Sequence, residues 1–284
     1  MGSTVRVRLD LAYDGTDFAG WQQQPDRDTV QGRIEAAVGR LYRRAPGQRT
    51  SVVGAGRTDA GVHAEGQVAH FDAPAAIPPA GIRAGLNGLL PDAIRVLAAA
   101  EAAPDFHARF SATGKTYRYH LLPGAVVSPL RSRYAWPVGD GLSREAMEES
   151  AAALAGRHDF RAFFAAPPGE EPETPVRNVF TARFVEVGDD LVFEVTADGF
   201  LRYMVRRMVG TLAAIGRGQL PPERVAAMLR DPDASGPRFR APAAGLRLYR
   251  VHYGHGSGTN PAASVPDGGA PGTAKLAGPC PGAP

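Results

Sequence analysis

The sequence lacks the features that mark several specialised classes of protein. Its single cysteine, Cys280, has no partner for an internal disulfide, so a disulfide-stapled scaffold is excluded and a reducing compartment is expected. No apolar run approaches the ~18 residues that a membrane-spanning helix needs, and the residues after Met1 contain no apolar signal core. We therefore expect a cytoplasmic protein that has no contact with a membrane.

The overall composition is that of a soluble globular protein. Hydrophobic residues make up 44% and charged residues 21% of the 284 positions, which argues against a collagen-like or wholly disordered chain. A chain of this length corresponds to about two domains and can bury a sizeable core without staples.

The small net charge conceals an uneven distribution. The chain carries 32 basic and 29 acidic side chains, for a net charge of +3. Three stretches, 36–58, 106–139 and 199–222, contain no Asp or Glu and together carry 14 Arg and Lys residues. If the three stretches lie on one surface of the folded protein, they would attract a polyanion. If they point in different directions, they are ordinary solvated faces. Charge alone leaves both interpretations open.

The first 105 residues mix strand and helix patterns. Residues 5–13 alternate apolar and polar side chains, which predicts a strand with one buried face. Residues 29–42 repeat apolar side chains at helical spacing behind Asp28 and Thr29, either of which can cap a helix. Shorter patterns predict strands at 51–53, 67–71 and 94–97 and a helix at 80–89. We expect an N-terminal α/β lobe over residues 1–105.

Residues 106–253 repeat this mixture and predict a second α/β lobe. The patterns indicate strands at 115–122 and 246–253, a hairpin of 179–187 and 191–196, and helices at 143–154 and 201–215. The segment 167–173 is proline-rich and acidic, and is predicted to be an exposed loop. From Gly254 onward 31 residues include eight Gly and six Pro, so 254–284 is predicted to be a disordered tail. The expected fold class is α+β.

A glycine-rich segment at 54–63 is the first candidate for chemistry. Its three glycines allow sharp turns and a close approach to a ligand, and they surround Arg57 and Asp59. The segment has neither the ending of a phosphate-binding P-loop nor the spacing of a dinucleotide fingerprint. A loop in which Arg57 simply pairs with Asp59 is the plain alternative.

Three nearby side chains allow a metal hypothesis. His63, His70 and Asp72 are potential ligands, and His70 and Asp72 share one face of the expected strand. Nothing in the spacing brings His63 to them, and no cysteine or two-histidine helical motif accompanies them. A metal site is therefore disfavoured.

The helix at 201–215 and the strand at 115–122 supply further candidates. Arg206 lies on a face opposite the apolar arc of the helix, and a buried guanidinium there would need a carboxylate. Asp198 or Glu194 could provide it as a purely structural partner, or Arg206 could simply be exposed to solvent. Tyr117 and Tyr119 share one face of a strand, where sheet packing is the common role.

The motifs together resemble those of the TruA family of tRNA pseudouridine synthases. They run in the family's order from about Val5 to Tyr253, and the tail lies outside them. The matching segments are 13–22 (YDGTDFAGWQ), 56–64 (GRTDAGVHA), 106–112 (FHARFSA), 115–117 (KTY), 158–160 (HDF), 199–201 (GFL), 204–206 (MVR) and 241–246 (APAAGL).

The resemblance implies a fold and an activity. The fold would be two α/β lobes that share a central, largely antiparallel sheet, with the active-site cleft between them. The enzyme would convert uridine to pseudouridine at nucleotides 38, 39 and 40 of the tRNA anticodon stem-loop, without metal or cofactor. A homodimer whose tRNA touches both subunits is also implied.

Residue roles follow from the same resemblance. Asp59 would be the catalytic carboxylate, Tyr117 would stack on the target base and Arg206 would pair with Asp59. Leu246 would pack in the same pocket, and Arg57 would help to displace the base. These roles suit the reaction, because a uracil that is cut from its sugar, rotated and rejoined through C5 must be unstacked and held throughout. Whether Asp59 attacks the sugar, attacks the base or accepts a proton is left open.

Two other functions remain open at this stage. A non-catalytic RNA-binding protein or RNA chaperone of the same fold would also explain the acid-free basic stretches. A metal hydrolase built on His63, His70 and Asp72 is the third hypothesis.

Overall fold

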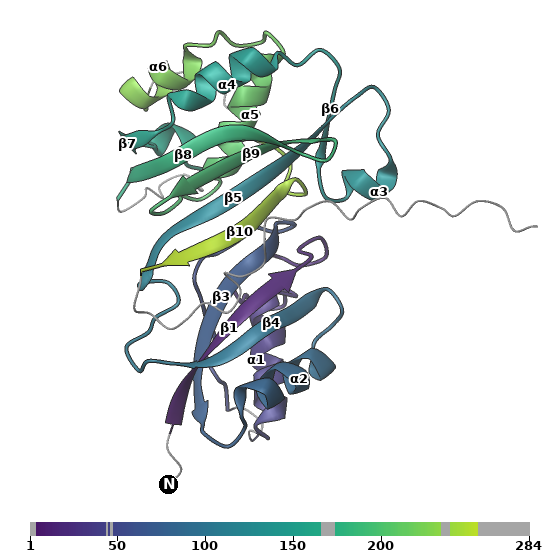
Figure 1. The fold of residues 1–284 in the computed structure, drawn as a ribbon, viewed down its shortest axis with the longest axis vertical. Helices are drawn as coiled ribbons and strands as arrows, with labels where there is room; N and C mark the ends of the chain where they lie inside the picture. The colour runs from purple at the N-terminus through teal and green to yellow at the C-terminus, as the bar shows by residue number, and fades with distance from the viewer. Residues whose placement is uncertain (1–3, 44, 46–47, 166–173, 234–238, 255–284) are drawn as a thin grey trace, which may run out of the picture.

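The protein is built on one continuous sheet of ten strands (Figure 1). The computed structural model describes residues 4–254 apart from 44, 46–47, 166–173 and 234–238. The main strand order is β4-β1-β3-β10-β5-β9-β8-β7, and the short strands β2 and β6 pair with β3 and β5. The sheet therefore runs through both halves of the chain.

The N-terminal half supplies β1 (Thr4–Tyr13), β2 (Val53–Gly54), β3 (His63–Pro74) and β4 (Ile94–Ala102). Two helices, α1 (Val30–Leu41) and α2 (Pro79–Leu89), lie together on one face of these strands (Figure 1). The alternating pattern of β1 buries Val7, Leu9 and Leu11 completely. Thr29 caps α1 by accepting a hydrogen bond from the Gly32 amide.

The C-terminal half supplies the longest run of antiparallel pairing. Its strands are β5 (Ala112–Pro123), β6 (Trp136–Gly139), β7 (Gly156–Asp159), β8 (Val176–Val187) and β9 (Asp190–Ala197). Its helical elements are α3 (Pro129–Ser132), α4 (Arg144–Ala152), the 3-10 turn η1 (Arg161–Phe163), α5 (Met204–Gly216) and α6 (Arg224–Arg230). Helix α5 packs against α4, η1 and α6, and residues 208–216 of α5 are all buried. Its apolar residues thus form the centre of the second core.

The last strand, β10 (Leu246–Tyr253), joins the two halves. It pairs in parallel with β3 at only two register positions, Arg247 with His63 and Leu248 with Ala64. Its other edge pairs with β5 along most of its length in antiparallel register. Because β10 links β3 to β5, the start of β3 and the start of β10 meet at the middle of the sheet.

The expected fold class is confirmed: two α/β halves share a large, mostly antiparallel sheet. The predicted strand at 67–71 is part of the longer β3, and the one at 51–53 shrinks to Val53–Gly54. The predicted helix at 201–215 begins only at Met204, because Tyr203 adopts a left-handed conformation with φ of 61°. The predicted loop at 167–173 and the predicted tail beyond Gly254 lie outside the described residues.

Several elements were not predicted at all. They are β6, β7, α3, η1 and α6, each of seven residues or fewer. Within the described part of the chain, none of the helices has the length and apolar character to cross a membrane.

Candidate active site

The loop that carries Arg57 and Asp59 connects β2 with β3, and the segment after β1 holds it in place. The Tyr13 hydroxyl and Thr58 Oγ1 share a hydrogen bond of 2.8 Å. The Trp21 amide donates to the Thr58 carbonyl at 3.0 Å, and the Gly61 amide donates to the Phe18 carbonyl at 3.3 Å. The motif at 13–22 therefore shapes the backbone on both sides of Asp59.

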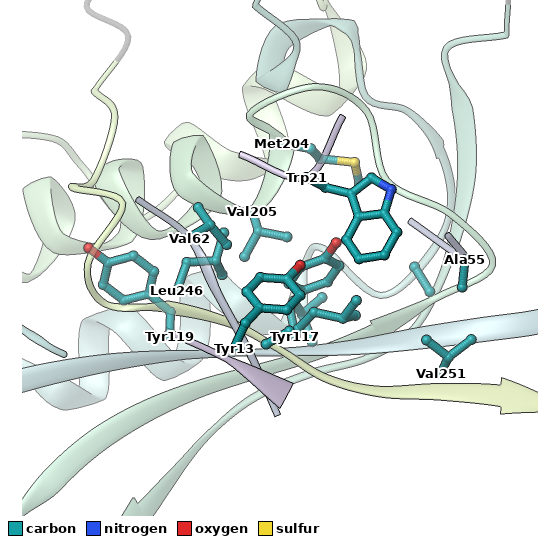
Figure 2. Packing of buried hydrophobic residues seen from close by; sticks show 14 of the residues in the cluster. Tyr13, Trp21, Ala55, Val62, Tyr117, Tyr119, Met204, Val205, Leu246 and Val251 are labelled. Atoms are coloured by element: carbon teal, nitrogen blue, oxygen red, sulfur yellow. The ribbon is translucent and has the colours of Figure 1, made fainter. Parts of the chain in front are cut away.

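Trp21 packs directly against the strand end from which this loop departs. A Cβ atom at Gly54 would lie 2.5 Å from the Trp21 ring, so only glycine fits there. Trp21 is 2% exposed and its ring lies 6.1 Å from that of Tyr13. Figure 2 shows the hydroxyl ends of Tyr13 and Tyr117 pointing toward Trp21. The rings of Trp21, Tyr13 and Tyr117 thus form a packed aromatic floor against which the loop lies.

His63 fastens the end of the loop to the segment before β10. Its Nδ1 accepts a hydrogen bond from the Gly15 amide at 3.1 Å. Its Nε2 must then carry the proton and donate to the Ala244 carbonyl, also at 3.1 Å. Burial lowers the pKa of His63, although nearby Asp14 opposes this effect. A neutral ring with both nitrogens engaged therefore links the two halves.

The three side chains of the metal hypothesis are each held by other groups. His70 Nδ1 accepts from the Ala108 amide at 3.1 Å, and Asp72 pairs with Arg6 at 2.8 Å. Among the described residues, no three His, Cys, Asp or Glu side chains gather so that they could hold an ion. The structure does not assemble the site that this hypothesis requires.

Asp59 meets Arg206 across the junction of the two halves. The Nη1 atom of Arg206 lies 3.4 Å from Asp59 Oδ2, and the two side chains are 12% and 25% exposed. Arg206 Nε donates to the Ala241 carbonyl at 2.9 Å, and the Ala241 amide donates to the Arg206 carbonyl at 2.9 Å. The guanidinium is thereby fixed by the chain segment that leads into β10.

The structural alternative for Arg206, a pairing with Asp198 or Glu194, is wrong. Asp198 accepts from the Asn178 amide, and Glu194 accepts from the side chains of Arg118 and Arg183. Neither carboxylate is the partner of Arg206.

Arg57, in turn, does not pair with Asp59. It is exposed, and it makes no hydrogen bond or ion pair with any residue that the structure describes. The loop thus presents one guanidinium to solvent and one carboxylate to Arg206.

The position of Asp59 sets its proton affinity. Burial raises the pKa of Asp59, and the attraction of Arg206, Arg202 and Arg240 lowers it by less, so the pKa lies above the ordinary aspartate value. An ionised Asp59 is a desolvated carboxylate, more basic than one in water.

Tyr117 lies on β5 beside the loop. It is 6% exposed, and Phe200 packs edge-on against its ring at a centroid distance of 5.0 Å. Burial raises the pKa of Tyr117 far above its ordinary value, so the phenol stays neutral. The Lys115 stem and the Tyr117 hydroxyl end both lie against Gly56.

Leu246 begins β10 and is 5% exposed. Figure 2 shows it in the same apolar cluster as Val62 of the loop and Val205 of the first turn of α5. The structure thus brings Asp59, Arg206, Tyr117 and Leu246 to the region where β3, β5, β10 and α5 meet.

Two arginines near Asp59, Arg202 and Arg240, and the tyrosine that both contact, Tyr203, escaped the sequence analysis as site residues. The guanidinium groups of Arg202, Arg206 and Arg240 all lie over the ring of Tyr203. The helix predicted at 201–215 places Arg202 one turn before Arg206, so helical spacing could have pointed to it, whereas Arg240 lies on a connecting segment without periodicity. Only its place immediately before the motif at 241–246 could have drawn attention to it.

Comparison with known proteins identifies the family. A family model described as tRNA pseudouridine synthase matches residues 11–111 and 150–254. The chain is 47% identical over 247 residues to "tRNA pseudouridine synthase A" of Syntrophotalea carbinolica, covering 87% of this chain and 96% of that protein. The protein of the same name from Moorella thermoacetica is 46% identical over 251 residues, covering 87% and 99%. The chain belongs to the tRNA pseudouridine synthase family.

Members of this family are isomerases, so the chain is an enzyme of that class. Among solved structures, one chain of a Cbf5-Nop10-Gar1 complex aligns with 86% of this chain and 58% of its own length, at 12% identity and a TM-score of 0.32. The matched ranges of the family model include Asp59, Arg206 and Leu246 but leave out Tyr117.

Proposed function

We propose that this protein converts uridine to pseudouridine at nucleotides 38, 39 and 40 in the anticodon stem-loop of tRNA, with Asp59 as the catalytic carboxylate. The observation that carries the proposal is the contact of 3.4 Å between Asp59 and Arg206, made from opposite halves of the sheet. The family to which the chain belongs supports the substrate class and the reaction.

The reaction makes demands that these residues can meet. The glycosidic C–N bond must break, the freed uracil must rotate, and its C5 must bond to the sugar. A carboxylate can act as a nucleophile or proton acceptor in this sequence. Desolvation makes the Asp59 anion more reactive, while Arg206 keeps it oriented and compensates part of its charge.

The target base must leave its stack before Asp59 can reach it. In our proposal Arg57, exposed and without a partner among the described residues, occupies the space that the base vacates. Tyr117 stacks on the displaced uracil, and its neutral ring holds the base without fixing its rotation about the stacking axis. Leu246 closes the apolar side of the pocket.

The decisive experiment maps pseudouridine by mass spectrometry in a tRNA transcript that has uridine at 38, 39 and 40. Wild-type protein should convert these uridines, and D59N should bind the tRNA with no conversion. D92N is the matched control, because Asp92 is fully exposed and pairs with Arg95 on the far strand β4. If D59N still isomerises uridine, the catalytic assignment is wrong. If wild type and D59N both bind tRNA and neither forms pseudouridine, the non-catalytic RNA-binding function is correct instead.

We also propose that the protein acts in the cytoplasm as a homodimer whose tRNA contacts both subunits. The three acid-free stretches support tRNA binding, since they supply Arg57, Lys115 and Arg206 to one region of the molecule. Multi-angle light scattering should give a mass near twice 29.9 kDa at working concentration. A monomer under these conditions would contradict the dimer.

A further inference from the structure

We propose that Arg240, packed against the ring of Tyr203, binds a phosphodiester of the backbone next to the target uridine. The inference rests on the proposed function, because the phosphate is that of the nucleotide whose base enters the Asp59 pocket. It assigns Arg240 to positioning the substrate and leaves the catalytic role to Asp59.

The geometry centres on one tyrosine. The guanidinium carbons of Arg240, Arg202 and Arg206 lie 4.8, 5.2 and 5.4 Å from the centre of the Tyr203 ring. Cation–π contacts hold a guanidinium by its flat face and leave its N–H edge free to bind oxygen atoms. A planar N–H edge matches two oxygens of a phosphate, which is why arginine is favoured at such sites.

The backbone of Tyr203 strengthens the case for a functional arrangement. Tyr203 has φ of 61° and ψ of 4° at the start of α5, a left-handed conformation that is strained for a residue other than glycine. Its side chain makes no capping hydrogen bond to the helix. A strained residue that does not cap its helix but places its ring among three arginines is typical of a binding site.

The charge around the pocket also calls for an anion. Arg206, Arg202 and Arg240 all lie near enough to Asp59 to lower its pKa by electrostatic attraction, and Arg206 is hydrogen-bonded to it. Arg206 is committed to Asp59 and to the Ala241 carbonyl. Arg240 is exposed and makes no hydrogen bond or ion pair with any residue in the described part of the chain. The positive charge of Arg240 is therefore uncompensated within the described part of the chain, and a backbone phosphate would neutralise it.

A binding cycle tests the inference. The dissociation constants of two anticodon stem-loop RNAs are compared. One RNA has normal phosphodiesters throughout, and the other has a single uncharged methylphosphonate. The comparison is made twice, with the methylphosphonate on the 5′ side and then on the 3′ side of the target uridine. Both RNAs carry the same 2′-O-methyl groups. Wild-type protein should bind the uncharged RNA about 10-fold or more weakly at one of the two linkages, the magnitude of a lost charge-assisted hydrogen bond. R240Q should bind the two RNAs equally, and R240K should discriminate between them only partly.

R144Q is the matched control, because Arg144 is 46% exposed on α4, and its removal changes the net charge by the same amount. It should discriminate as wild type does. Full discrimination by R240Q would overturn the inference, and so would equal binding of both RNAs by wild type at both linkages. These outcomes are independent of the proposed function, which fails only if wild type forms no pseudouridine. Unchanged thermal unfolding of R240Q would separate lost phosphate binding from misfolding.

Discussion

Asp59 and Arg206 stand 147 residues apart in the chain and meet at 3.4 Å. Asp59 is placed by a loop fixed to the segment after β1, and Arg206 by the first turn of α5 and the Ala241 carbonyl. The pair therefore forms only when both halves of the sheet are joined. Within this pair, desolvation raises the pKa of Asp59 by more than the nearby arginines lower it.

This balance predicts the acid limb of the activity profile. Activity should need ionised Asp59 and fall as pH drops through its pKa, which burial places above the ordinary aspartate range. R206Q removes the largest effect that lowers this pKa, so the midpoint of the acid limb in kcat/KM should move to higher pH. At neutral pH the activity should also drop about 10- to 150-fold, the worth of a hydrogen bond to a charged group. A pH series of kcat/KM for wild type, R206Q and R144Q measures both effects; an acid limb that stays in place in R206Q contradicts this account.

The same shift predicts how D59N changes stability with pH. Folding raises the pKa of Asp59, so its protonated form favours the folded state, and that contribution is lost as pH rises through the folded pKa. Relative to D59N, wild type should therefore gain free energy of unfolding as pH falls through the folded pKa. Urea unfolding of both proteins at closely spaced pH values gives this difference directly. A difference that stays constant or changes in the opposite direction would show that the pKa is not raised.

Local patterns predicted most of the fold but only part of the site. The alternation in β1, the capping by Thr29 and the hairpin of β8 and β9 depend on neighbours in sequence, so periodicity finds them. The strands β6 and β7 have only four residues each, too few for a periodic pattern to reveal them. The partner of Arg206 could not be decided from spacing, since it depends on how β10 joins β3 to β5. The predicted helix begins later than expected, because Tyr203 adopts a left-handed backbone conformation that has no sequence signature.

Tyr117 provides a test of stacking. Its hydroxyl stays protonated, so Y117F should retain activity within about 3-fold of wild type. Y117L keeps an apolar side chain but removes the ring, and base stacking worth ~1–3 kcal/mol predicts a loss of about 5- to 150-fold in kcat/KM. Single-turnover assays of both variants, with circular dichroism to check folding, make the comparison. An inactive Y117F would point to a role for the hydroxyl instead.

His63 provides a test of the link between the two halves. Its neutral ring accepts from the Gly15 amide and donates to the Ala244 carbonyl, and its pKa is lowered by burial. H63L should therefore leave a buried amide and a partly buried carbonyl without these partners and lower the free energy of unfolding by about 1–3 kcal/mol. Because His63 does not hold a metal in this arrangement, bound metal measured by mass spectrometry should be the same in H63L and wild type. Loss of a stoichiometric metal in H63L would revive the metal-site hypothesis.

A pair of glycine substitutions tests whether the aromatic floor positions the loop. A Cβ at Gly54 would come within 2.5 Å of the rigid Trp21 ring, whereas a Cβ at Gly39 on α1 meets nothing within 4 Å. G54A should lower the free energy of unfolding by about 1–3 kcal/mol, because Trp21 must shift in a packed core. G39A should raise it by about 0.5–1 kcal/mol, since alanine is the better helix former. Trp21 also holds Thr58 through its amide, so G54A should reduce kcat even at temperatures where the protein remains folded, and G39A should leave kcat unchanged. If G54A lost stability but kept the kcat of wild type, Trp21 would support the fold without positioning Asp59.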